Sequence, residues 1–150
     1  MRTPHQIKYR GQLYRLAQPQ APRGLVVNIE AETTRNHDFR HVLYTGKHSQ
    51  LVLMSLPPGE DIGMEAHDVD QFFRVEAGTG EVEINGQKHA VKAEDAVVVP
   101  AGAKHNVRNT GKAPLQLYTI YSPPHHQDGT VARTKAEVVE EHFDGTTTEG

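Results

Sequence analysis

Cysteine is absent from the 150-residue chain, which excludes a disulfide framework and any metal site built on thiolates. No apolar stretch is long enough to span a bilayer, and the charged start of the chain lacks the apolar run that would make it a secretory signal. Basic residues form no run and the formal net charge is only −3, so neither nucleic acid nor a membrane surface is expected as a partner. These absences predict a soluble, cytoplasmic protein.

Histidine, in contrast, is abundant, with ten copies in the chain. Imidazole is a common metal ligand and titrates near neutral pH. The count raises the expectation of a metal or acid–base site, although most of these side chains are expected to be solvated.

The middle of the chain carries the signals of short β-strands. Apolar runs at 50–56, 71–77, 96–100 and 114–121 are separated by turns rich in proline and glycine, and Asn85-Gly86 is the strongest short signal for a type I′ hairpin. This spacing predicts an all-β sandwich or barrel, and the length fits one domain with a single core.

The two ends of the chain are predicted to differ from this middle part. Three segments are expected, namely an N-terminal arm (1–24), a single barrel (25–125), and a C-terminal loop, helix and tail (126–150). The helix is predicted over 136–143, because Thr134 and Glu137 form a capping-box pattern ahead of it. The tail after the helix is expected to fray.

The arm contains several apolar residues but is too polar to form a core of its own. These residues are Ile7, Tyr9, Leu13, Tyr14 and Leu16. Since a lone barrel leaves sheet edges exposed, the arm is predicted to pack on a partner barrel in a homodimer. A disordered arm is the alternative.

The stretch from Gly63 to Gly80 places polar groups where a hydrophobic strand begins. If one strand ran through it, Glu65, His67 and Gln71 would share a face with Phe73 and Val75, which need a core. Polar groups that face inward are costly unless a partner satisfies them, and a metal ion would do so. Solvation at an open rim is the alternative, and a loop between 67 and 71 would break the alternation.

A second stretch, PAGAKHNVRN, carries a more specific pattern. Pro100, Gly102, His105 and Asn109 give Pro-x-Gly-x-x-His-x-x-x-Asn, which resembles the second sequence motif of the cupin superfamily. That motif begins with a glycine, where this chain has Glu94. In such a motif Asn109 is expected to stabilise a turn rather than to bind metal.

The first cupin motif is present in a degenerate form. When it is set against Gly78, its glutamate position falls on Gln71 and its two histidine positions fall on His67 and Glu65. The resemblance covers residues 45 to 122. Within the superfamily, the sequence looks like that of small bacterial single-domain, RmlC-like cupins.

The resemblance implies an all-β jelly-roll (cupin) β-barrel, to which the capping-box pattern adds one short C-terminal helix. It further implies that one divalent transition metal is held by Glu65, His67, Gln71 and His105. This set of nitrogen and oxygen ligands suits Mn, Fe, Co, Ni or Zn. Four ligands would close a tetrahedral structural zinc site but would leave two positions open on an octahedral ion, and the resemblance favours the octahedral arrangement.

Three functions remain open at this stage. The first is a metal-dependent enzyme that acts on a small polar molecule, of the dioxygenase, isomerase or lyase class. The second is a non-catalytic small-molecule binding or sensing module, and the third is a barrel in which the metal is only structural. No general base stands out beyond the ligands. Alternation does not decide whether Tyr118 or Tyr121 faces the pocket, and His125 and His126 are expected to lie in a solvated loop.

Overall fold

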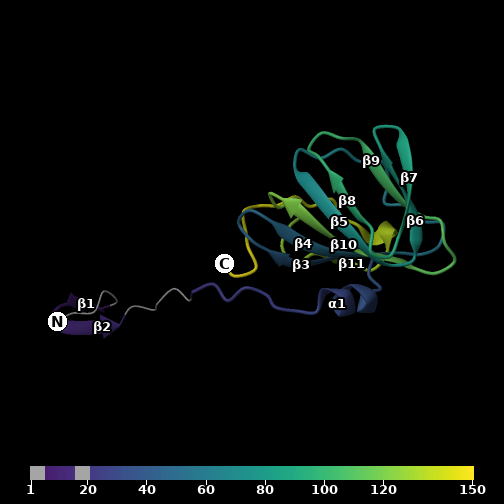
Figure 1. Cartoon of the computed structure of the whole chain (residues 1–150). Helices are drawn as coiled ribbons and strands as arrows, with labels where there is room; N and C mark the ends of the chain where they lie inside the picture. The colour runs from purple at the N-terminus through teal and green to yellow at the C-terminus, as the bar shows by residue number, and fades with distance from the viewer. Residues whose placement is uncertain (1–5, 16–20) are drawn as a thin grey trace.

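The computed structural model describes residues 6–15 and 21–150. Its main body is a barrel made of two antiparallel sheets, with strand orders β11-β3-β4-β10-β5-β8 and β7-β6-β9 (Figure 1). The strands of the first sheet are β3 (Arg40–Thr45), β4 (Gln50–Leu56), β5 (Asp70–Ala77), β8 (Ala96–Val99), β10 (Leu115–Ser122) and β11 (Val131–Ala132). Those of the second are β6 (Thr79–Ile84), β7 (Gln87–Lys92) and β9 (His105–Asn109). The predicted all-β jelly-roll fold is confirmed.

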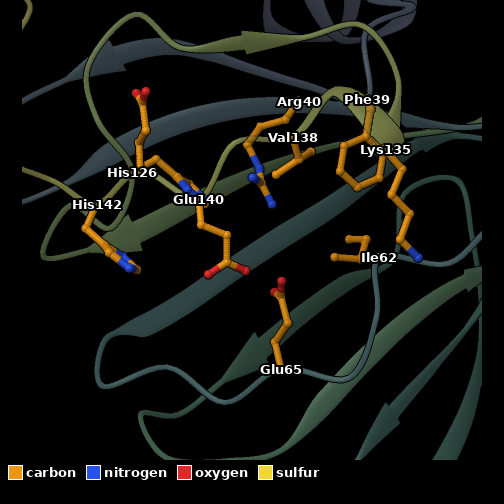
Figure 2. A pocket seen from close by; sticks show the side chains of 10 residues that line it. Phe39, Arg40, Ile62, Glu65, His126, Lys135, Val138, Glu140 and His142 are labelled. Atoms are coloured by element: carbon orange, nitrogen blue, oxygen red, sulfur yellow. The ribbon is translucent and has the colours of Figure 1, made fainter.

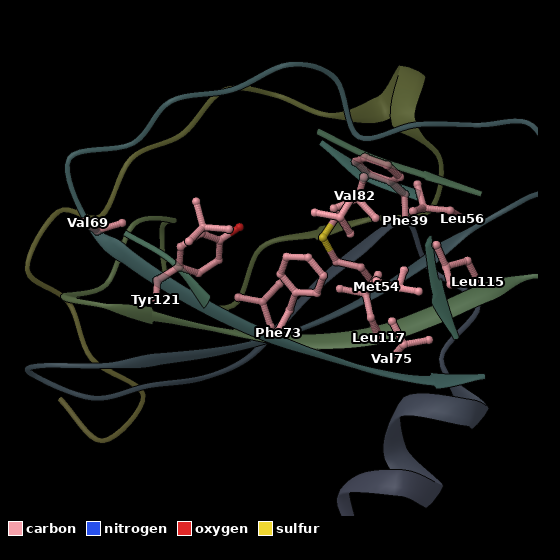
Figure 3. Close-up of a cluster of buried hydrophobic side chains, with 14 of the residues drawn as sticks. Phe39, Met54, Leu56, Val69, Phe73, Val75, Val82, Leu115, Leu117 and Tyr121 are labelled. Carbon is pink, nitrogen blue, oxygen red and sulfur yellow. The ribbon is translucent and has the colours of Figure 1, made fainter. Parts of the chain in front are cut away.

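The hydrophobic core fills the space between the two sheets. Along β5, Gln71, Phe73 and Val75 are buried while their neighbours are less so, as the alternation predicted. Phe73 packs in one cluster with Met54 and Leu117 (Figure 3). The inward face of β5 therefore carries the core residues Phe73 and Val75 and, near the start of the strand, the buried amide of Gln71.

The α-helix α1 (Ile29–Arg35) covers the outer face of the larger sheet. It begins at Asn28, whose side chain accepts a hydrogen bond from the backbone N–H of Ala31 at 2.9 Å, a standard N-cap. The amide of Gln116 on β10 donates to the carbonyl oxygens of Thr34 and Asn36. These bonds satisfy the end of the helix and fasten it to the sheet.

The short C-terminal helix is present, but it is the 3₁₀ helix η1 (Lys135–Glu137) and does not extend over 136–143 as predicted. The side chain of Thr134 makes no capping bond. The carboxylate of Glu137 instead accepts from the backbone N–H of Arg133 at 3.2 Å. Further along, His142 forms a β-bridge with His126, and the N–H of Phe143 donates to the carbonyl of His125. Pairing with another segment takes the backbone groups that a helix would use.

The tail also departs from its prediction. The N–H of Thr148 donates to the carbonyl of Thr45 at 2.9 Å, and the N–H of Thr45 donates to the hydroxyl of Thr148 at 2.7 Å. The tail is therefore attached to the end of β3 and does not fray.

Two turns match the sequence signals closely. Asn85 and Gly86 both have positive φ, at 46° and 83°, as a type I′ hairpin requires. Gly78 has φ 91°, and a Cβ there would lie 2.5 Å from the carbonyl oxygen of Pro114, so the residue against which the first motif was set must be glycine. Glu94, in the place of the second motif's first glycine, also has positive φ, at 77°.

The arm contains a hairpin of β1 (Gln6–Tyr9) and β2 (Gln12–Arg15), which Figure 1 draws apart from the barrel. The side chains of Ile7, Tyr9, Leu13 and Tyr14, and the whole of Leu16, lie outside the described part of the structure. The predicted packing of the arm on a partner therefore stays a prediction. Among the described residues, no helix has the length and apolar character needed to cross a membrane.

Candidate metal centre

Glu65, His67 and His105 are brought together in the interior of the barrel. Each offers one ligand atom, and the three atoms lie within 4.8 Å of one another. β5 begins only at Asp70, so Glu65 and His67 lie in the loop that precedes it and not on a continuous strand. The loop alternative, which the sequence left open, is the one that the structure has.

The loop is fixed by backbone bonds to the segment around β9. The N–H of Glu65 donates to the carbonyl of His105, and the N–H of His105 donates to the carbonyl of Glu65, at 2.9 and 2.8 Å. The carbonyl of His67 accepts from the N–H of Gly102 at 2.7 Å. These main-chain bonds place the loop residues Glu65 and His67 beside His105 of β9.

The ring of His105 is oriented by one hydrogen bond. Its Nδ1 lies 3.0 Å from the carbonyl oxygen of Ala103, and we assign the proton to Nδ1 because a carbonyl only accepts. Nε2 then keeps its lone pair, which is the state a metal-binding histidine needs. His105 is only 4% exposed, so this lone pair faces the interior rather than water.

Glu65 and His67 hold each other in place. Nε2 of His67 is 3.0 Å from Oε2 of Glu65. Burial by itself would raise the pKa of Glu65, but the hydrogen bond with His67, the nearby cation of Arg40 and the rings of His67 and His105 together lower the pKa below its usual value. The carboxylate is thus anionic at neutral pH, as a cation ligand must be.

Gln71 points inward from β5 and is 6% exposed. Its Nε2 donates to the hydroxyl of Thr119 at 3.0 Å, and that hydroxyl donates to the carbonyl of Phe72 at 3.0 Å. This chain of bonds fixes the orientation of the amide and leaves Oε1, which is buried and has no hydrogen-bond partner in the described part of the chain. An unsatisfied buried acceptor costs about 1–3 kcal/mol. A cation at this place would satisfy it, so the residues present fit a metal ion.

A cavity of about 220 Å³ borders this group through Glu65. Figure 2 shows the guanidinium of Arg40 and the carboxylate of Glu65 pointing into it. The side of the cavity away from Glu65 is formed largely by the C-terminal segment, through Lys135, Val138, Glu140 and His142.

Two residues that the sequence did not assign to the site, Tyr121 and His125, lie beside it. The ring of His125 lies 4.1 Å from that of His67 and stacks on Tyr121 at 5.5 Å, measured between centroids. Tyr121 is 2% exposed, so it is Tyr121 that faces inward, whereas Tyr118 packs with Phe72. Burial raises the pKa of Tyr121, which keeps its hydroxyl neutral.

The prediction that His125 and His126 lie in a solvated loop is wrong for His126, which is 8% exposed. The buried amide of Gln50 on β4 explains this. Its Nε2 donates to the carbonyl of His126 at 2.7 Å, and its Oε1 accepts from the N–H groups of His125 and His126. Burial lowers the pKa of His125 to about 4 and that of His126 to about 2, so both rings are neutral at physiological pH.

Asn109 has the turn-stabilising role predicted for it. Its Nδ2 donates to the carbonyl oxygens of Leu56 and Ala113, and its Oδ1 accepts from the N–H of Gly111. All of its polar atoms are used within the turn, so none is available to a metal.

Comparison with known proteins agrees with this architecture. The family model described as Cupin domain matches residues 52–121. The crystal structure of BH2720 from Bacillus halodurans superimposes with a TM-score of 0.75 at 51% identity, covering 80% of this chain and 96% of that one. The chain belongs to the cupin superfamily.

Two further relatives show a higher and a lower level of sequence identity. YrkC from Bacillus subtilis is 52% identical over 125 residues, which are 79% of this chain and 67% of YrkC. More distantly, an oxalate-binding protein from Thermotoga maritima is 29% identical over 68 residues, which are 45% of this chain and 56% of that protein.

Proposed function

We propose that this cupin binds one divalent transition-metal ion, of the set Mn, Fe, Co, Ni and Zn, through Glu65, His67, His105 and Oε1 of Gln71. One observation carries the proposal: the three clustered ligand atoms lie in the same barrel interior as a buried amide oxygen that has no partner among residues 6–15 and 21–150. Neutral imidazole nitrogens and hard oxygens in one site suit these metals.

We further propose that the site is that of a metal-dependent enzyme on a small polar molecule, of the dioxygenase, isomerase or lyase class. The bound ion would supply Lewis-acid polarisation of a substrate oxygen. The chain's own residues orient the ligands: Ala103 holds the ring of His105, and Thr119 holds the amide of Gln71. The cavity beside Glu65 supports this proposal because a purely structural ion needs no adjoining space.

A non-catalytic small-molecule binding or sensing module is the second candidate. The name of the Thermotoga maritima relative, an oxalate-binding protein, supports it. Cytoplasmic location and a homodimeric state stay predictions from the sequence.

Metal analysis of protein expressed in defined medium tests metal binding, which both candidate functions require. We expect about one ion per chain in the wild type and a loss of this ion in His67→Ala and His105→Ala. Wild-type protein that stays metal-free after incubation with each of the five metals would refute the site. Turnover of a bound small molecule by the loaded protein would then separate the enzyme from the binding module.

A further inference from the structure

We propose that the cavity beside Glu65 is a carboxylate subsite, in which Arg40 pairs with one end of a small organic acid while the other end reaches the metal. This inference rests on the proposed function, because it uses the ion as the second anchor. It names the class of ligand that the site takes and a residue that selects it.

Arg40 has no side-chain hydrogen-bond or ion-pair partner among the residues that the structure describes. It is the first residue of β3, and its backbone is paired on both sides, with Met54 of β4 and Ala132 of β11. Its guanidinium carbon lies 5.6 Å from the centroid of the Phe39 ring, a cation–π contact that limits its motion. Its Nε is buried and has no hydrogen-bond partner among the described residues.

Glu65, which lines the cavity with Arg40, does not form an ion pair with it. The carboxylate of Glu65 is bonded to His67, and its negative charge would be shared with a bound ion. Lys135, another cation of the cavity wall, is already bonded to Asp61 at 2.8 Å. Glu140 and Glu141 also line the cavity, so with a divalent ion the charges around it sum to about zero, and neither carboxylate bonds to Arg40 in the described part of the structure. A guanidinium only donates, so the group that would satisfy Arg40 is an acceptor, and an anion is the strongest one.

A second unpartnered group lies in the wall of the same cavity. Nε2 of His126 is buried without a hydrogen-bond partner among the described residues, and His126 lines the cavity together with Arg40. A neutral imidazole can donate from this nitrogen. A guanidinium with an adjacent N–H donor matches a planar carboxylate, which accepts two parallel bonds from arginine. A phosphate dianion would require more cationic donors than the guanidinium of Arg40 supplies.

The size of the cavity limits the ligand. At about 220 Å³, it lies below the roughly 300–1,000 Å³ of pockets that hold drug-sized ligands. A mono- or dicarboxylate of a few carbon atoms fits this space, and a nucleotide does not.

The test is isothermal titration calorimetry on the metal-loaded, full-length protein. Malonate is titrated against its neutral analogue malonamide and against inorganic phosphate. We expect malonate to bind and both of the others to bind at least about tenfold more weakly, since only the carboxylate meets the guanidinium fork. Arg40→Met should weaken malonate binding at least about tenfold while the metal content stays unchanged.

Lys135→Met is the matched control. It removes the same charge from the wall of the same cavity, but its ammonium is committed to Asp61, so malonate affinity should change less than about threefold. Arg40→Lys, which keeps the charge without the fork, should fall between wild type and Arg40→Met and covers the case in which Arg40→Met fails to fold. Malonate that binds no better than malonamide, or equal losses in Arg40→Met and Lys135→Met, would overturn the carboxylate subsite and leave the metal site standing. A wild type that binds no metal would refute both the metal site and the carboxylate subsite.

Discussion

The backbones of Glu65 and His105 hydrogen-bond to each other in both directions, with N–O distances of 2.9 and 2.8 Å. This pairing joins the loop before β5 to the first residue of β9 and sets two ligand side chains next to each other. Because the bonds run between main-chain atoms, replacement of either side chain should leave the loop in place. Ligand variants therefore report on metal binding rather than on collapse of the site.

His67→Ala and His105→Ala should each lower metal affinity at least about a hundredfold, because a lost ligand costs more than the 10–100-fold of a lost supporting residue. Glu65→Ala should do nearly the same by removing the single anionic ligand. Asp70→Ala is the control, since Asp70 is exposed beside the site and its carboxylate only accepts from the N–H of Ala101. Metal titrations on the four variants would check this, and loss of metal from Asp70→Ala with retention in His67→Ala would contradict it.

Gln71→Glu should tighten metal binding at least about tenfold, since a full negative charge replaces an amide oxygen next to the ion. The hydroxyl of Thr119, which now donates to Phe72, can turn its proton to the new carboxylate. Gln71→Ala should weaken binding least among the ligand variants, because water can replace a neutral oxygen. Competition with a chelator of known affinity measures both changes. Equal affinities for wild type and Gln71→Glu would mean that residue 71 is not a ligand.

Removal of the metal should lower thermal stability. An ion that binds only the folded state adds about 2.7 kcal/mol when its free concentration is 100 times the dissociation constant. For a chain of this length, that corresponds to a drop in Tm of roughly 5–10 °C on chelation. Calorimetry with and without chelator tests this, and the drop should disappear in His105→Ala. An identical Tm for metal-loaded and stripped wild type would count against a site in the folded protein.

The alternation of residues predicted part of the site, and the rest depends on contacts between distant segments. Burial of Gln71 with Phe73 and Val75 follows from the two-residue period of a strand, and the placement of His105 follows from its motif. Arg40 gave no signal, because its role depends on β3 lying opposite the loop of Glu65. His126 was assigned to solvent because the partner that buries its loop, Gln50, lies on a different strand.

The helix assignments show a local signal that was missed and one that was misleading. Helix α1 follows the N-cap residue Asn28 and has acidic residues in its first turn and Arg35 in its last turn. This pattern indicates both ends of a helix. At Thr134 the capping pattern is present, yet the chain beyond it pairs with the segment at His126. Long-range pairing there outweighs local propensity.

Glu94→Gly should stabilise the fold. Glu94 has φ 77° and is held there because its N–H donates to the carbonyl of Val75 at 2.8 Å. A side chain in this left-handed region costs about 1–2 kcal/mol, and the greater freedom of glycine in the unfolded chain returns roughly 0.5–1 kcal/mol of that. We expect a net gain of about 0.5–1 kcal/mol in urea unfolding and no gain for Glu94→Ala. If Glu94→Gly is less stable than the wild type, the carboxylate of Glu94 contributes more to folding stability than its left-handed backbone conformation costs.

The attachment of the tail through Glu149 should depend on pH. Its carboxylate accepts from the hydroxyl of Tyr44 and from the N–H groups of Arg23 and Gly24, and the bond from Tyr44 is the main cause that lowers the pKa of Glu149 from its ordinary 4.5. A carboxyl whose pKa is lower in the folded state stabilises that state above the unfolded pKa, and this contribution is lost as pH falls through the folded value. We therefore expect the residues around Glu149 to gain mobility below a pH of about 4.5, measured by ¹⁵N relaxation of the last residues. Glu149→Gln should show the mobile tail already at neutral pH, and a wild-type tail that stays equally ordered at pH 3 and pH 7 would mean that the bonds of Thr148 hold it without Glu149.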